Sequence, residues 1–400
     1  MKHLLAALAA VASLVHAGHA LAQKKYDPGA SDTEIKLGQN QPYSGPASAY
    51  GSLGRTQVGF FKMLNEQGGV NGRKVTLISL DDGYSPPKTI EVVRRLVESD
   101  EVLALFATLG TPTNSAIHRY VNQKKVPHLF VSSGAGKWND PKNFPYTVGF
   151  QPNYVAEGKV FAAHIMATKP NAKIAILYQN DDFGKDYLIG IRQGLGDKAS
   201  MLVAEASFEV TDPTVDSQVL TLKGSGADVL INAASPKFAA QAIKKAADSG
   251  WKVTQYITNV SATIGSVLRP AGLEASTGLI TTQFMKDPGD KQWDSDADMV
   301  TYKAFMKKYY PEGDVNDQLN LLAYSSANAM TYVLRQAGDN LTRENLMKIA
   351  TSLKDVRMPG TLPGLLLNTS ATNHGPLSTL RMARFDGKQW VGFGEPITGR

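Results

Sequence analysis

Short apolar runs alternate with segments of helical periodicity along most of the chain. Four runs in the first part are typical of buried parallel strands: 35–38, 75–80, 103–107 and 126–131. Apolar residues at helical spacing lie between them, and Pro86-Pro87 marks the start of one of these helices. The alternation predicts an α/β fold whose first doubly wound lobe is complete near Gly149.

The same rhythm continues in the second part of the chain. Strands are expected at 174–178, 202–206, 229–233 and 255–258. Helices are expected at 155–166, 215–223, 237–250, 264–271, 298–310, 319–336 and 343–353. The end differs, with short strands predicted at 365–367, 380–384 and 390–393. Since single cores rarely exceed about 250 to 300 residues, we expect two lobes.

The first 22 residues have the three parts of a secretory signal peptide. Residues 1–3 are a charged start, residues 4–15 an apolar core too short to span a bilayer, and residues 20–22 a cleavage site of the A-x-A type. We expect cleavage before Gln23. The chain has no cysteine, which excludes disulfides and a cysteine-linked lipid anchor. We therefore expect an exported protein of the periplasm.

The charge pattern argues against nucleic-acid binding. The chain has 42 basic and 36 acidic residues, and basic residues cluster only in short pairs such as Lys124-Lys125 and Lys307-Lys308. No basic stripe is interleaved with aromatic residues, so these pairs are read as solvated helix faces. We expect neither a nucleic acid nor a cofactor as a partner.

The sequence lacks the motifs of common enzyme classes. It contains no G-x-x-x-x-G-K-[ST], H-E-x-x-H or G-x-S-x-G, and its histidines show no metal-ligand spacing. Gly194-Leu195-Gly196 weakly matches a dinucleotide pattern but follows a predicted helix and not a strand. We therefore predict that the protein is not an enzyme.

Two loops of small polar residues follow the third and fourth predicted strands. The first runs from Thr108 to Asn114 and the second from Ser132 to Gly136. In an open parallel sheet such loops lie at the carboxyl ends of the strands, where ligands bind. Hydroxyl groups and the free N–H groups of a helix start suit an anion, most simply a carboxylate. The alternative is that Thr111 and Asn114 only cap the following helix and that the serines are turn residues.

Several landmarks in the correct order give the chain a family resemblance. They are Ser44-Gly45-Pro46 with Tyr50-Gly51, the turn 68–72, Asp81-Asp82, Tyr178 with Asp182-Phe183-Gly184, and Thr254-Gln255-Tyr256. In these features the sequence resembles the branched-chain amino-acid-binding proteins of ABC importers, over essentially the whole mature chain. The run 144–150 is similar to that of members that bind aromatic acids.

The resemblance implies a type I periplasmic-binding fold with two doubly wound lobes joined by a multi-strand hinge. On this basis lobe 1 comprises residues 34–149 plus 283–355, and lobe 2 comprises residues 150–282 plus 356–392. The ligand is expected between the lobes, and an ABC permease in the inner membrane is the implied partner of a monomeric protein.

The resemblance also implies a ligand site at specific positions. Family members hold the ligand carboxylate with the loops that here contain Gly110, Thr111 and residues 132–135, namely Ser132, Ser133, Gly134 and Ala135. Gly110 stands where a serine hydroxyl is common, and Phe183 where a tyrosine is common. Tyr50 matches a family aromatic residue at the cleft mouth.

One departure from the family pattern concerns the amine of an amino-acid ligand. Family members that bind amino acids place an acidic side chain where this chain has Val260, beside Asn259. An amino-acid ligand whose ammonium group lacks a buried counter-charge loses several kcal/mol of binding free energy, since breaking a buried pair costs about 3 to 5 kcal/mol. We therefore expect an organic acid, aromatic if Tyr50, Trp138, Phe150 and Phe183 line an apolar slot.

Two alternatives stay open. Asp182 could supply the missing charge, in which case the ligand is a branched-chain amino acid. The same fold also serves periplasmic sensor lobes that act on membrane kinases, and the residues do not separate that role from transport.

Overall fold

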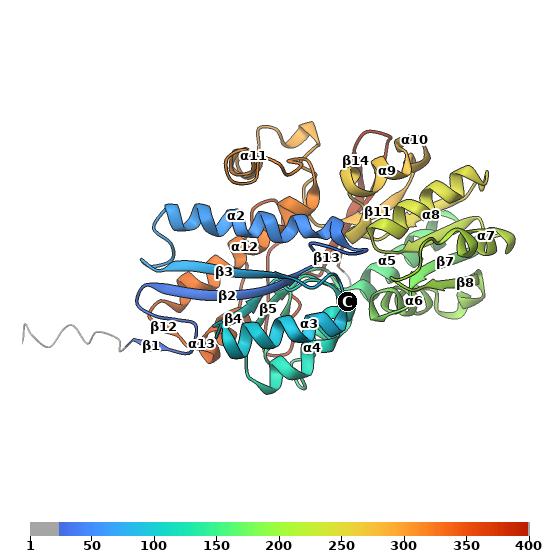
Figure 1. Ribbon diagram of the computed structural model, residues 1–400. Coiled ribbons are helices and arrows are strands. Elements are labelled where there is room, and N and C mark those ends of the chain that lie inside the picture. Colours follow the sequence, from blue (N-terminus) through green and yellow to red (C-terminus); the bar gives the residue numbers. More distant parts are fainter. Residues whose placement is uncertain (1–23, 399–400) are drawn as a thin grey trace, which may run out of the picture.

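The computed structural model describes residues 24–398, and it confirms the α/β class with two lobes (Figure 1). The predicted signal peptide, residues 1–22, lies outside the described residues. Lobe 1 is the part built on a five-stranded sheet, and lobe 2 is the part built on a seven-stranded sheet. Within the described residues, no helix is both long and apolar enough to cross a membrane.

The sheet of lobe 1 is entirely parallel, in the order β3-β2-β4-β5-β6. Its strands are β2 (Glu34–Gln41), β3 (Lys74–Asp81), β4 (Ala104–Phe106), β5 (His128–Val131) and β6 (Thr147–Gly149). Its helices are α2 (Gly51–Glu66), α3 (Pro86–Arg94), α4 (Thr111–Gln123), α11 (Ala297–Tyr309), α12 (Gln318–Ala337) and α13 (Arg343–Ala350). Figure 1 shows α2 and α12 on one face of this sheet and α3 and α4 on the other.

The sheet of lobe 2 is mixed, in the order β14-β13-β11-β10-β9-β7-β8. Its strands are β7 (Ile174–Gln179), β8 (Leu202–Phe208), β9 (Val229–Ala233), β10 (Thr254–Ile257), β11 (Ile280–Gln283), β13 (Thr379–Phe385) and β14 (Trp390–Thr398). The helices are α5 (Tyr154–Thr168), α6 (Asp182–Leu195), α7 (Asp216–Gly224), α8 (Pro236–Asp248), α9 (Arg269–Ala271) and α10 (Leu273–Ser276). A small parallel ladder pairs β1 (Lys25–Tyr26) with β12 (Asn340–Leu341).

The predicted strand at 365–367 is wrong. The backbone of Leu367 forms a single antiparallel bridge with Val356 and joins neither sheet. The apolar side chains of Leu365 and Leu367 are buried, so this run anchors a loop on the core. Conversely, the sequence pattern did not reveal β6, which has only three residues. The exact ranges of the two lobes stay a prediction.

Glycines let α5 and α6 pack unusually closely. A Cβ atom on Gly158 would lie 3.0 Å from the Cα of Gly190, and one on Gly194 would lie 2.6 Å from the Cβ of Ala162. Gly194, from the weak dinucleotide pattern, therefore serves helix packing. This contact joins the middle of α5 to the second half of α6.

The core of lobe 1 should depend on α2. Phe61 is buried on this helix, and its ring meets Phe106 of β4 edge-on at 5.8 Å. We expect Phe61→Ala to lower the free energy of unfolding by about 3 to 5 kcal/mol, because it leaves a cavity between helix and sheet. Urea unfolding followed by circular dichroism measures this. Val58→Ala on the same helix, 44% exposed, is the control and should change stability by less than about 0.5 kcal/mol.

Candidate functional site

The two polar loops predicted from the sequence meet at one edge of the lobe 1 sheet. β4 and β5 are parallel neighbours, and beyond them Leu109 and Ser132 form a further parallel bridge. The N–H of Gly110 donates to the carbonyl of Ser132 at 3.3 Å. The strand ends therefore bring the loops side by side, as the parallel order requires.

A pocket between the lobes begins at this edge. Seven of the residues predicted for the site line it: Tyr50, Gly110, Thr111, Ser132, Phe183, Asn259 and Val260. The Tyr50 hydroxyl in lobe 1 donates to the carbonyl of Val260 in lobe 2 at 3.3 Å. This bond spans the cleft, so the described conformation is a closed one.

The lobe 1 end of the pocket offers uncharged hydrogen-bond donors. Thr111 is the first residue of α4, and among the described residues no acceptor is recorded for its N–H. The Ser132 hydroxyl likewise has no recorded partner within residues 24–398, although the side chain is only 8% exposed. These groups lie at the positive end of the α4 dipole, which favours an anion.

Three predicted residues lie on the other side of the second loop. Ser133, Gly134 and Ala135 line a neighbouring crevice and not the pocket. The Ser133 hydroxyl is 2.7 Å from that of Thr111 and accepts a hydrogen bond from the Trp138 indole at 2.8 Å. Ser133 therefore hydrogen-bonds to Thr111 from the side of the crevice, and Trp138 holds the second loop in place.

Asp182 does not line the pocket. Its carboxylate accepts from the Lys137 ammonium at 2.7 Å and from the Ser115 hydroxyl at 3.3 Å, so it ties α6 of lobe 2 to lobe 1. One turn later Asp186 accepts from the N–H of Gly136 at 2.8 Å. Together these contacts form a clasp at one rim of the closed cleft. Asp181 caps α6 by accepting from the N–H of Phe183, and burial raises its pKa to about 6.

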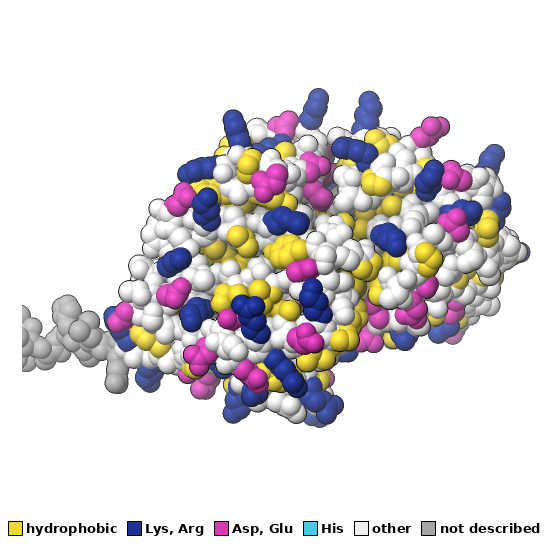
Figure 2. Space-filling model, viewed as in Figure 1, with side chains coloured by type: hydrophobic (Ala, Val, Ile, Leu, Met, Phe, Trp, Pro, Cys, Tyr) yellow, Lys and Arg dark blue, Asp and Glu magenta, His cyan; other side chains and the backbone are white. Residues whose placement is uncertain are grey.

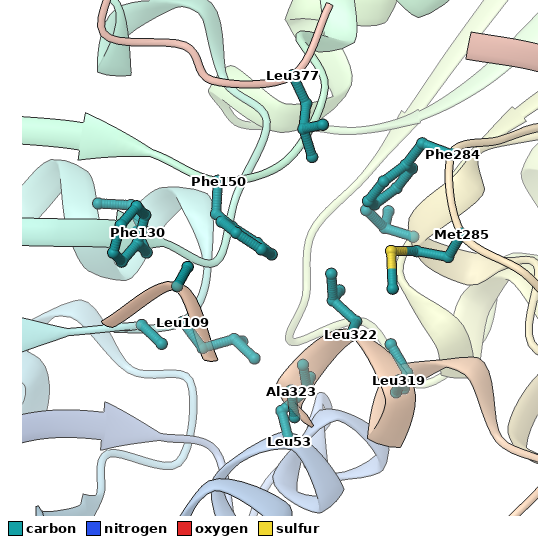
Figure 3. Packing of buried hydrophobic residues seen from close by; sticks show 14 of the residues in the cluster. Leu53, Leu109, Phe130, Phe150, Phe284, Met285, Leu319, Leu322, Ala323 and Leu377 are labelled. Carbon is teal, nitrogen blue, oxygen red and sulfur yellow. The ribbon is translucent and has the colours of Figure 1, made fainter. Parts of the chain in front are cut away.

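The far wall of the pocket is apolar. Figure 3 shows Leu319 and Leu322 extending from α12 toward Met285 and Phe284, which follow β11. Leu53 of α2 completes the wall near α12. Phe150, which we expected in an apolar slot, is instead buried in the core against Phe130. The pocket thus pairs a polar end with an apolar end.

Sequence reasoning missed most of this lining. The residues it did not find are Leu53, Tyr84, Leu109, Gln151, Tyr154, Ser235, Thr263, Phe284, Met285, Gln318, Leu319 and Leu322. Five of them lie on α2, α5 and α12, whose positions depend on the packing of distant elements. The other seven lie on segments that follow strands. In the described part of the chain, no residue that lines the pocket carries a formal charge.

Glu157 is a second feature that the sequence did not reveal. Its side chain on α5 is fully buried and accepts hydrogen bonds from Tyr187 of α6, Thr282 of β11 and Asn259 of the pocket wall. Burial raises the pKa of its carboxyl to about 7, against the effect of these donors. The local sequence around Glu157 gives no sign of such a role.

Two relatives of known name match between 64% and 82% of the chain. The "Leu/Ile/Val-binding protein homolog 7" of Brucella suis is 26% identical over 269 residues, which are 64% of this chain and 66% of that protein. The "Leu/Ile/Val-binding protein homolog 1" of Brucella abortus is 23% identical over 337 residues, 82% of this chain and 84% of that protein.

Solved structures show the same fold. A branched-chain amino-acid ABC transporter protein of Thermus thermophilus with bound valine has a TM-score of 0.83 at 17% identity, covering 92% of this chain and 97% of that one. A solute-binding protein of Rhodopseudomonas palustris in complex with 3,4-dihydroxybenzoic acid has a TM-score of 0.76 at 16% identity, covering 92% and 98%. A fatty-acid ABC transporter substrate-binding protein of Thermomonospora curvata has a TM-score of 0.77 at 22% identity, covering 94% and 95%.

These three structures bind chemically different ligands, so the fold alone does not name the ligand of this chain. The periplasmic binding protein family matches residues 34–389, which is most of the sequence. The chain belongs to the periplasmic binding protein family.

Proposed function

We propose that the protein is the solute-binding component of an ABC importer and that it captures a small carboxylate, an aromatic or other organic acid. The observation that carries this proposal is the pocket itself, which has neutral donors at one end, an apolar wall at the other and no charged lining residue among those described. Such a site suits a molecule with one anionic head and an apolar body.

Neutral donors are sufficient to hold a carboxylate here. The Thr111 N–H and the Ser132 hydroxyl lie at the start of α4, where the helix dipole favours negative charge. Hydrogen bonds to a charged acceptor contribute about 1.5 to 3 kcal/mol each. Two or three such bonds compensate the carboxylate for the water it loses when the lobes close.

The same pocket is unfavourable for binding an amine. Val260 lines the wall where amino-acid binders carry an acid, and the nearby carboxylates of Asp181 and Asp182 are engaged in a helix cap and in the clasp. A desolvated ammonium group would lack a counter-charge, which costs about 3 to 5 kcal/mol when a buried pair is broken. A branched-chain amino acid, suggested by the names of the relatives, is therefore the second candidate.

Tyr84 explains why glycine occupies position 110. Gly110 has a φ of +98°, and a Cβ atom on it would lie 2.5 Å from both the Tyr84 ring and the Thr113 hydroxyl oxygen. Tyr84 is itself held at a φ of +60° because its N–H donates to buried Asp82 at 2.9 Å. The ring thus fills the space of a serine side chain, and the anion must be held by Thr111 and Ser132.

Capture is proposed to work by closure of the lobes. Lobe 1 fixes the carboxylate, and lobe 2 then swings over the rest of the ligand and excludes water. Closure is favoured by the difference in ligand contacts between open and closed forms. The closed protein, exported to the periplasm by its signal peptide, then docks on a permease whose ATPase supplies the energy. The protein performs no chemistry on its ligand.

The first test removes the proposed side-chain donor. We expect Ser132→Ala to weaken binding of an acid ligand by about 10- to 100-fold, because a charge-assisted hydrogen bond is lost while the backbone N–H of Thr111 stays. The ligand is first found by a thermal-shift screen of benzoate, aliphatic acids and branched-chain amino acids on refolded, ligand-free protein. Titration calorimetry then measures the affinity. Ser217→Ala, an exposed hydroxyl on α7, is the control.

Two results would contradict the proposed function. Unchanged affinity in Ser132→Ala would show that the Ser132 hydroxyl does not hold the carboxylate. Thermal shifts with leucine or valine, and with none of the amine-free acids, would show that an amino acid is the ligand.

The second test concerns the packing of Gly110 against Tyr84. Gly110→Ser should lower the free energy of unfolding by about 1 to 3 kcal/mol, because a side chain at positive φ is strained and meets the Tyr84 ring. Adding Tyr84→Ala should recover part of this loss as a coupling energy, which urea unfolding of the four proteins measures. Gly136→Ala, where the nearest atom would be 3.4 Å away, is the control. Purely additive effects would show that the two residues do not compete for space.

A further inference from the structure

Glu157 joins three elements of lobe 2 to one residue of the pocket. The N–H and the side-chain nitrogen of Asn259 reach its two oxygens at 3.0 and 2.7 Å, and the Thr282 hydroxyl reaches it at 2.7 Å. Tyr187 donates the fourth hydrogen bond. Within the described residues no ion pair involves Glu157, and the titratable groups that face it are Tyr187 of α6 and Tyr154 of its own helix. The remaining partners are neutral.

This arrangement fixes the orientation of the Asn259 amide. An ionised carboxylate only accepts hydrogen bonds, so the amide must turn its NH₂ group toward Glu157. Its oxygen is then directed away from Glu157, and no donor for it is recorded among residues 24–398. Asn259 lines the pocket. Lobe 2 therefore presents an unpaired carbonyl oxygen to the ligand.

We propose that Glu157 is a positioning residue that makes the cleft selective for carboxylates bearing an O–H donor, such as hydroxy acids, over the corresponding acids without one. The inference rests on the proposed function, because it assumes that the carboxylate is bound at the lobe 1 end. A ligand without a donor leaves the Asn259 oxygen desolvated and unpaired when the lobes close. An unpaired buried polar atom costs more binding free energy than a typical hydrogen bond contributes.

Protonation of Glu157 provides a second test of the same preference for ligands with an O–H donor. When the acid is protonated it can donate to the amide oxygen, and the amide can then turn its NH₂ group toward the ligand. Since burial raises the pKa of Glu157 to about 7, the preference for a donor should be stronger at pH 8 than at pH 6. The tyrosines facing it stay neutral across this range because burial raises their pKa values.

The experiment compares ligands that differ by one group. Calorimetry on the mature protein is run with benzoate, 3-hydroxybenzoate and 4-hydroxybenzoate, and with 4-methylpentanoate, its 2-hydroxy derivative and L-leucine. We expect the hydroxylated member of at least one series to bind about tenfold more tightly than the plain acid at pH 8.

Variants connect the preference to Glu157. Glu157→Gln replaces the acceptor-only group, and it should reduce the tenfold preference to about twofold and remove its pH dependence. Asn259→Ala should remove the preference even if Glu157→Gln fails to fold. Glu209→Gln, the same change at an exposed carboxylate of lobe 2, should leave the preference intact. A merely structural role of Glu157 would lower the melting temperature and the affinity for all ligands without changing their ratio.

The outcomes separate the two proposals. Hydroxylated and plain acids that bind within threefold of each other would overturn this inference and leave the proposed function standing. A preference that survives Asn259→Ala would also overturn it. Binding of leucine with no binding of any acid, or no binding in either series, would overturn the proposed function and the inference with it.

Discussion

A charge enclosed between two lobes must be met by partners that replace water, and this requirement governs the cleft. The pocket has no charged lining residue among those described, so an anion there depends on N–H and hydroxyl groups alone. Lobe 2 handles its own enclosed carboxylate in the same way, since Glu157 is surrounded by neutral donors from α6, β11 and the pocket wall. Donor geometry therefore carries more of the selectivity than net charge.

The closed conformation is held by one contact at the rim of the cleft and one between residues that line the pocket. Lys137 and Asp182 form the clasp at one rim, and the Tyr50 hydroxyl reaches Val260 across the cleft. The clasp pair is about half exposed, so its contribution is small and screened by salt. Because these contacts are weak, the binding free energy of a ligand is sufficient to shift the equilibrium between the open and closed forms. Figure 2 shows charges of both signs interspersed over one face, while hydrophobic side chains follow the seam between the lobes.

Much of the fold could be predicted because local patterns of apolar residues indicate its strands and helices. Apolar runs gave the parallel strands, and Pro86-Pro87 marked the start of a helix, which α3 confirms by beginning at Pro86. The site could be predicted only at strand ends, since parallel order brings those loops together. Tyr84 and Glu157 could not be found, because their roles depend on a left-handed backbone and on partners 102 and 125 residues away. The run 365–367 misled because buried leucines anchor loops as well as strands.

Three aspartates in the first turns of α6 show why a charge near a site is weak evidence for ligand contact. Asp181 caps the helix, while Asp182 and Asp186 bind groups of lobe 1. Each carboxylate already accepts a hydrogen bond within the protein. Pairing one of them with a ligand amine would therefore break the helix cap or the clasp. Among the described residues, the pocket groups without an internal partner include the Thr111 N–H, the Ser132 hydroxyl and the Asn259 oxygen. A ligand that fits this set has an acceptor at one end and a donor elsewhere, and neither end needs a charge from the protein.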